Sequence, residues 1–184
     1  YKIFQKGETN GIFQFESSGM KEKLRLLRPT EFNDIVAMNA LYRPGPMAQI
    51  ETYVRRKHGE EKVVYPHPHL EKILRDTYGV IVYQEQIMLI AVNFAHMSLN
   101  EADNMRRAVS KKKKEDLEYY GRIFIEKSVA AGYDLNIAKK LFDLIVTFAN
   151  YGFNKSHAVV YSMLAYRLAY LKVYYTKYFM TALL

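Results

Sequence analysis

The chain has 184 residues, of which 49% are apolar, and a formal net charge of +8 at pH 7. This length and composition suffice for one hydrophobic core, and the lack of cysteine excludes a disulfide framework, a cysteine-based zinc site and a thiol nucleophile. The cation excess favours a polyanionic partner, although many basic proteins never bind nucleic acid.

Helical periodicity recurs along most of the chain. The predicted helical ranges, in chain order, are 31–41, 51–58, 70–76, 84–95, a helix that begins near 99, 115–130, 137–148 and 157–184. Residues 80–83 are mostly β-branched and too few for a helix, so this segment is expected to be extended. We therefore predict a mainly α, multi-helix globular domain over 1–184, with at most a short strand or extended segment.

Local signals mark several helix ends. Thr30 is the predicted N-cap of the helix over 31–41, and Pro44 and Pro46 end that helix because proline lacks the backbone donor. Ser98 and Glu101 have the spacing of a capping box, which predicts a helix start near residue 99.

The two ends of the sequence indicate a fragment of a larger chain. The first residue is Tyr1 instead of methionine, and the last residues lie inside an apolar helical pattern without a cap. Residues 1–20 lack the basic start and apolar stretch of a signal peptide, so we expect a cytoplasmic protein. Segment 158–184 is long enough to span a membrane, but Arg167 and Lys172 near its middle favour a buried or partner-packed helix.

The stretch Tyr-Gly-Phe-Asn-Lys-Ser-His at 151–157 predicts a phosphate socket. The amides of a helix's first turn have no intrahelical acceptors, and the N-terminal end of a helix favours anions. Asn154, Lys155, Ser156 and His157 would complete the socket with polar and cationic side chains. His157 can also act as a general acid, but we prefer an electrostatic contact with phosphate.

Two further basic groups lie upstream. Arg106 and Arg107 are three and four residues after Asp103, so the carboxylate can pair with either arginine and hold it for a phosphate. A basic run follows in a predicted solvated loop and is a candidate phosphate or DNA contact, consisting of Lys111, Lys112, Lys113 and Lys114.

Arg43 and Tyr161 are the remaining candidate nucleotide contacts. Pro44 restricts the backbone of Arg43, although an arginine at a helix end more often pairs with carbonyls. Tyr161 is one turn beyond His157 and can stack on a base or sugar. Five tyrosines follow on the same helix, and we expect most of them to be packing residues, namely Tyr166, Tyr170, Tyr174, Tyr175 and Tyr178.

No metal site is predicted in this sequence. His67 and His69 have a spacing that can bind a metal, but the flanking prolines favour an exposed rigid connector. Glu101 and Asp103 are better explained by capping and pairing, and Glu85 has no evident carboxylate partner.

Five ordered motifs carry a resemblance to a known family. They are Gly-Ile-Phe-Gln-Phe-Glu-Ser-Ser-Gly-Met at 11–20, Ala-Leu-Tyr-Arg-Pro-Gly-Pro at 40–46, Tyr-Gly-Val-Ile-Val-Tyr-Gln-Glu-Gln at 78–86, Met-Arg-Arg-Ala at 105–108 with Lys-Lys-Lys at 111–113, and the stretch at 151–157. Together they resemble the alpha subunit of bacterial DNA polymerase III, a C-family replicative polymerase. We assign the polar residues of 14–18 and 84–86 to the fold by default.

The resemblance implies a fingers domain that follows the palm and closes over the incoming deoxynucleoside triphosphate against template–primer DNA. It implies two Mg²⁺ ions in the full-length enzyme, held by palm carboxylates that this sequence does not show. The fragment would therefore bind substrate, be inactive alone, contact the palm and other domains of its parent, and reach replisome subunits through absent regions. The alternative is a non-catalytic helical nucleic-acid-binding module in which the socket is only a helix cap.

Overall fold

The computed structural model describes residues 1–111, 113–149 and 151–184, so the predicted DNA contact Lys112 lies outside the described residues. The chain divides into two compact units, a first unit of Tyr1–Glu60 with Lys155–Leu184 and a second unit of Glu61–Asn154. Regular secondary structure in the described ranges is helical, which confirms the mainly α prediction. That both units act as one domain over 1–184 stays a prediction.

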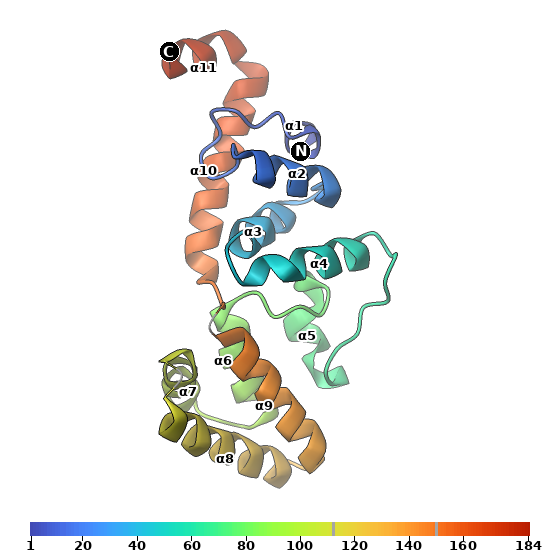
Figure 1. The fold of residues 1–184 in the computed structure, drawn as a ribbon, viewed down its shortest axis with the longest axis vertical. Coiled ribbons are helices and arrows are strands. Elements are labelled where there is room, and N and C mark those ends of the chain that lie inside the picture. Colours follow the sequence, from blue (N-terminus) through green and yellow to red (C-terminus); the bar gives the residue numbers. More distant parts are fainter. Residues whose placement is uncertain (112, 150) are drawn as a thin grey trace. The chain divides into compact units, whose positions relative to one another are not determined.

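The first unit combines the N-terminal helices with the last two helices of the chain (Figure 1). Its α-helices and one 3-10 helix, η1, are α1 (Lys2–Lys6), α2 (Ser18–Leu27), α3 (Phe32–Leu41), η1 (Pro46–Gln49), α4 (Ile50–Lys57), α10 (Lys155–Tyr174) and α11 (Thr176–Leu183). Helix α10 packs along α3, and α1 packs on α2. The two helices nearest the C-terminus therefore belong to the same core as the N-terminus.

Small side chains form the buried face of α10. Ala158, Ser162, Ala165 and Ala169 recur at intervals of four, three and four residues, which places them on one face of the helix. Most of the tyrosines after Tyr161 are exposed instead of packed, so that expectation is wrong for this chain; the exposed ones are Tyr170, Tyr174, Tyr175 and Tyr178. Alanine and serine allow a close helix approach, and the larger side chains consequently lie on the outer faces.

The predicted helix over 157–184 is wrong at its start and in its middle. It begins at Lys155 and is interrupted at Tyr175, where the chain leaves helical geometry with φ −129° and ψ 39°. The turn allows α11 to bury Phe179 beside Gly11. Gly11 has φ +77°, and a Cβ atom there would lie 2.5 Å from Leu183, so this approach requires glycine.

The second unit is a helical cluster around one hydrophobic core. Its helical elements, including the 3-10 helices η2 and η3, are η2 (Pro68–Leu70), α5 (Glu71–Leu74), η3 (Arg75–Thr77), α6 (Gln84–Phe94), α7 (Leu99–Lys111), α8 (Lys114–Ala130) and α9 (Leu135–Ala149). Helix α8 packs on α9, and α6 packs on α7. Phe94 and Phe124 are fully buried where these helices meet.

The extended segment expected at 80–83 is confirmed. Within the described residues it forms an isolated parallel bridge between Tyr83 and Phe153 instead of a strand. Buried Gln86 fixes this segment, because its side-chain oxygen accepts hydrogen bonds from the amides of Val82 at 2.8 Å and Tyr83 at 3.0 Å. Burial raises the pKa of the Tyr83 hydroxyl, so this tyrosine stays protonated.

The connector around His67 differs from the prediction. His69 is exposed, but the half-buried His67 ring packs on Phe94 and Tyr133 with centroid distances of 5.3 and 5.1 Å. His69 Nδ1 also lies 2.7 Å from the Tyr133 hydroxyl. Burial, followed by the neighbouring His69, lowers the pKa of His67. The histidines therefore tie the connector to the α8–α9 turn.

Candidate functional site

The first turn of α10 contains the cationic residues of the predicted socket. Because the helix begins at Lys155, the residues Lys155, Ser156 and His157 lie inside the first turn and not before it. The Ser156 and His157 side chains are exposed, and Lys155 is partly buried. The helix end thus combines first-turn amides with an amine, a hydroxyl and an imidazole, which is the chemistry that favours an anion.

The packing of α3 on α10 brings Arg43 to this end of the first unit. The Asn39 side-chain amide donates to the carbonyl oxygen of Ala158 at 3.4 Å, whereas Phe32, earlier on α3, contacts the ring of Tyr166, later on α10. The two helices therefore run antiparallel, and the end of α3 lies toward the start of α10. Arg43, two residues beyond the end of α3, comes to the same end.

Arg43 also pairs with a carbonyl at the end of α3, which was the alternative to a nucleotide contact. Its Nε donates to the carbonyl oxygen of Ala40 at 2.9 Å, which satisfies an acceptor at the end of α3. Burial lowers the pKa of its guanidinium, which nevertheless stays charged. A phosphate contact from Arg43 stays a prediction.

Tyr161 supports His157 from the next turn of α10. The two rings have a centroid distance of 4.2 Å, and the opposite neighbour of Tyr161 is Phe13 at 5.7 Å. Tyr161 is half-buried in this arrangement. It orients the imidazole by packing, and the stacking of a base on Tyr161 stays a prediction.

In the second unit, Asp103 pairs with both arginines as predicted. Arg106 donates from Nε and Nη2 to Asp103 Oδ1 at 3.0 and 2.6 Å, and Arg107 Nη2 lies 2.8 Å from Oδ2. The hydrogen bond from Arg106, with smaller contributions from both positive charges, lowers the pKa of Asp103. The carboxylate therefore stays ionised and holds both guanidinium groups on one face of α7.

The two arginines differ in their surroundings. The Arg106 side chain is 19% exposed and also donates to Gln84 Oε1 at 3.1 Å, which joins α7 to the start of α6. The Arg107 side chain is 64% exposed. Arg106 is thus held by two residues, Asp103 and Gln84, while Arg107 presents its guanidinium to solvent.

Asn154 lies at the start of α6 together with Arg106. The amide of Gln84 donates to the carbonyl of Phe153 at 3.0 Å, and Asn154 Nδ2 donates to Glu85 Oε1 at 3.1 Å. The segment that leads to α10 is therefore anchored on α6 by backbone and side-chain bonds. The sequence did not indicate Gln84 or Glu85 as the partners that position Arg106 and Asn154.

The predicted lysine loop is shorter than expected, because Lys111 ends α7 and Lys114 begins α8. Lys111, Lys113 and Lys114 are exposed, and Lys114 Nζ approaches Glu118 at 3.9 Å. These three lysines present positive charge at the α7–α8 junction, where a phosphate backbone can reach them.

The candidate residues fall into two groups by unit. Arg43, Lys155, Ser156, His157 and Tyr161 belong to the first unit. The second unit holds Arg106, Arg107, Asn154 and the lysines. Each group is assembled within its own unit.

The net charge is concentrated in the first unit. Its residues include fourteen lysines and arginines and seven acidic residues, whereas the second unit has thirteen and twelve. The lysine run at 111–114 is therefore nearly balanced by acids of the same unit. This distribution is not evident from the runs of charge in the sequence.

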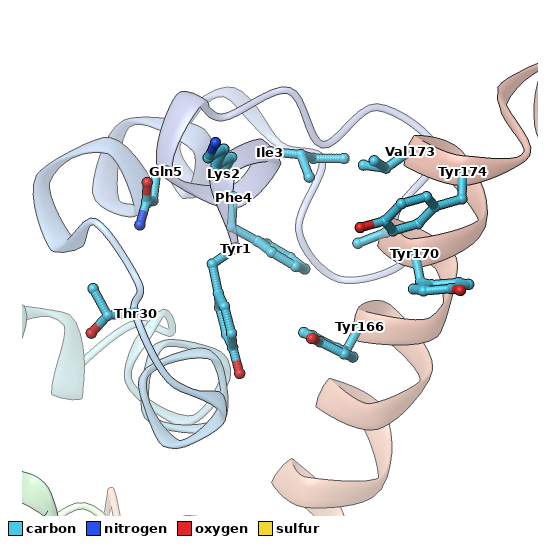
Figure 2. Close-up of a pocket in the computed structure, with 11 residues that line it drawn as sticks. Tyr1, Lys2, Ile3, Phe4, Gln5, Thr30, Tyr166, Tyr170, Val173 and Tyr174 are labelled. Atoms are coloured by element: carbon cyan, nitrogen blue, oxygen red, sulfur yellow. The ribbon is translucent and has the colours of Figure 1, made fainter.

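A cavity in the first unit was also missed by sequence reasoning. It has a volume of about 600 Å³ and lies between α1 and the second half of α10 (Figure 2). The rings of Tyr1 and Tyr166, which both line it, pack against each other with centroids 5.5 Å apart. Burial, followed by the neighbouring Tyr166, raises the pKa of Tyr1. Its tyrosines come from distant parts of the chain, so only the fold brings them together.

In the described ranges, histidine and acidic side chains do not gather in groups of three or more that could hold a metal ion. The helices of the described residues are also not long and apolar enough to cross a membrane.

The fold and the candidate residues define a mainly helical domain with cationic helix ends. Residues 1–132 match the family model described as the bacterial DNA polymerase III alpha subunit finger domain. The chain therefore belongs to this family, as the five motifs predicted.

Full-length relatives support the same assignment. The DNA polymerase III subunit alpha of Halalkalibacterium halodurans is 58% identical over 183 residues, covering 100% of this chain and 16% of that protein. The subunit of Bacillus subtilis strain 168 is 56% identical over 184 residues, with the same coverage. That of Staphylococcus aureus strain N315 is 53% identical over 179 residues, 97% of this chain and 17% of the relative. The chain thus spans about one sixth of the length of these relatives.

Proposed function

We propose that this chain is the fingers region of a replicative DNA-directed DNA polymerase and binds the incoming deoxynucleoside triphosphate and template–primer DNA. Membership of the finger-domain family supports the proposal. The observation that carries it is the first turn of α10, where Lys155, Ser156 and His157 accompany the helix-end amides. A triphosphate needs several cationic and hydrogen-bonding donors, and these groups are of the types that supply them.

Arg107 is the candidate contact on α7. Its guanidinium is largely exposed and is oriented by Asp103, so its outer donors can take a phosphate oxygen. Arg106 has fewer donors available because Asp103 and Gln84 already accept from it. We therefore assign Arg107 to phosphate binding and Arg106 mainly to the position of α7.

The polymerisation chemistry is proposed for the parent protein. There, carboxylates outside this sequence would hold Mg²⁺ ions. The ions would activate the primer 3′-hydroxyl and stabilise the pyrophosphate leaving group. The residues of this chain would bind and orient the triphosphate. We accordingly expect a cytoplasmic enzyme in which this chain contacts the palm and the other domains and absent regions reach replisome subunits. We expect no polymerisation by this chain alone.

The test compares Lys155→Ala and Arg107→Ala in the polymerase that carries this sequence. Both should raise the apparent KM for nucleotide or lower kcat, because each removes a charged contact worth a factor of about ten or more. The matched control is Arg122→Ala, which removes an exposed arginine of α8 outside the proposed contacts. Normal incorporation by both variants would show that the assignment of these residues is wrong.

The exposed lysines at the α7–α8 junction favour a second candidate function, a helical module that binds nucleic acid without catalysis. Both functions predict DNA binding that weakens steeply with salt, because lysines that contact phosphates release counterions. A flat salt response would contradict DNA contact by Lys111, Lys113 and Lys114. Binding of a deoxynucleoside triphosphate in competition with pyrophosphate separates the two, since only the polymerase function requires it.

A further inference from the structure

The tyrosine cavity of the first unit has the size and shape of a binding site. Its volume of about 600 Å³ lies within the usual range for small-ligand pockets, about 300–1,000 Å³. Aromatic rings form two of its walls, with Tyr1 and Phe4 from α1 and Tyr166, Tyr170 and Tyr174 from α10 (Figure 2).

The α10 wall is exposed although it is aromatic. Tyr170 is 51% exposed and Tyr174 is 69% exposed, and their ring centroids are 4.6 Å apart on successive turns of α10. Rings at this exposure contribute little to the core of the first unit. Their faces are therefore available for stacking, which is the preferred contact of an aromatic side chain with a planar ligand.

The lining of the cavity favours an anionic ligand, although the carboxylates of Asp34 and Glu31 lie near enough to contribute to the raised pKa of Tyr1. The described lining residues include one cation, Lys2, and they include no carboxylate. Lys6 is one turn further along α1, and Arg25 of α2 donates from Nε to the Lys6 carbonyl at 3.1 Å. These three cations are exposed and belong to the unit that holds most of the chain's net positive charge.

Aromatic walls beside a cationic surface form the combination that binds single-stranded nucleic acid. Bases stack on the rings, and the charged groups follow the phosphates. We propose that the cavity captures an unstacked base of single-stranded DNA, with Tyr170 and Tyr174 as the stacking surface and Lys2, Lys6 and Arg25 along the backbone. This inference rests on the proposed function, since the uncopied template strand of a polymerase is single-stranded DNA.

The experiment separates base contacts from phosphate contacts. Binding of a short oligothymidylate and of an abasic oligonucleotide of the same length is measured by fluorescence anisotropy at low salt, without nucleotide. Tyr170→Ala should weaken oligothymidylate binding by about 5- to 100-fold, the usual effect of one lost stacking ring, and leave abasic binding unchanged. Tyr170→Phe keeps the ring and should bind as the wild type does.

The matched control is Tyr119→Ala on α8, because Tyr119 is also 51% exposed but lies in the second unit. It should bind both oligonucleotides normally. Circular dichroism checks that each variant keeps its helical content, which is expected because both positions are half-exposed.

Three results would overturn the proposal. The first is equal affinity of the wild type for the two oligonucleotides. The second is an equal loss of oligothymidylate affinity in the Tyr119 and Tyr170 variants. The third is equal affinity of the intact polymerase for the two oligonucleotides, which would mean that other domains cover the cavity. The proposed nucleotide contacts are tested separately by the incorporation kinetics of the Lys155 and Arg107 variants. Either proposal can therefore fail while the other stands.

Discussion

Adjacent arginines on α7 give the sharpest test of how this domain divides structure from function. We predict that Arg106→Ala destabilises the fold, whereas Arg107→Ala leaves stability almost unchanged and affects ligand binding. Both residues pair with Asp103, and both substitutions remove the same side chain from the same helix. The comparison therefore controls for helix propensity and for the loss of one positive charge.

The magnitudes follow from exposure and from the number of bonds. Arg106 is 19% exposed and makes three hydrogen bonds, two to Asp103 and one to Gln84 on a different helix. Charge-assisted bonds contribute about 1.5–3 kcal/mol when shielded, and partial exposure reduces this, so Arg106→Ala should cost about 1–2 kcal/mol. The Arg107 side chain is 64% exposed and pairs with Asp103, and the loss of this exposed pair should cost about 0.5 kcal/mol or less.

Urea unfolding followed by circular dichroism measures both values on this chain. For a chain of this size, 1 kcal/mol also corresponds to about 2–4 °C in Tm, so the Arg106 variant should melt measurably below the Arg107 variant. In the intact polymerase the order of the kinetic defects should reverse once corrected for folded protein. Equal destabilisation by the two substitutions would refute the separation of roles.

Three further predictions concern stability. Hydrogen bonds from Lys127 and then from the Ser98 amide lower the pKa of Glu101 from 4.5 to about 2, so the stabilisation from Glu101 is complete above pH 4.5 and is lost as the pH falls toward 2. Glu101→Gln should flatten this part of the pH profile of urea unfolding. An unchanged profile would contradict the pairing. Gly121→Ala should lower the free energy of unfolding by about 1–2 kcal/mol despite the better helix propensity of alanine, because the new Cβ would lie 2.7 Å from Phe142. A more stable variant would mean that α8 and α9 can separate. Because the pKa of His67 is lowered, the free energy of unfolding should fall as the pH drops below 6.5, the ordinary pKa of histidine. His67→Gln should remove this loss of stability. An NMR titration that gives His67 an ordinary pKa would contradict the prediction.

Local rules located helix ends well where the capping groups are close in sequence. Ser98 and Glu101 form the predicted capping box, with the Ser98 amide donating to Glu101 Oε2 at 2.8 Å. Thr30 was predicted as the cap of α3, but Glu31 has that position because Asp34 Oδ2 accepts from both backbone amides, at 2.8 and 3.1 Å. The buried Asp34 also pairs with Lys57 at 2.8 Å, and this tertiary contact shifts the start of the helix by one residue.

Residue type alone did not predict which face of α10 is buried. A pattern of large apolar residues suggested that the tyrosines pack inward, since burial of large side chains usually contributes most. In the structure, Asn39 of α3 reaches across to Ala158 and Ser162 of α10, and this approach is possible only where side chains are small. The tyrosines are consequently left on the outside, where sequence periodicity gives no sign of the cavity they form.

The candidate residues show the same division between local and distant information. Pairing of Asp103 with both arginines follows from three- and four-residue spacing on one helix and was predictable. The different roles of Arg106 and Arg107 were not, because they depend on Gln84, 22 positions away in sequence. Spacing identifies the charged groups, and tertiary contacts decide which of them keeps donors for a ligand.

Net charge differs between the two units. The lysines at 111–114 dominate the sequence visually, yet the second unit carries twelve acidic residues against thirteen basic ones, whereas the first carries seven against fourteen. Long-range attraction of a polyanion depends on the summed field, because local pairs such as Lys114 and Glu118 cancel beyond about one Debye length. The first unit should therefore draw DNA toward the chain, and the lysines of the second unit should act only at contact distance. This division matches the proposals made for the tyrosine cavity and for the first turn of α10, which both lie in the more positive unit.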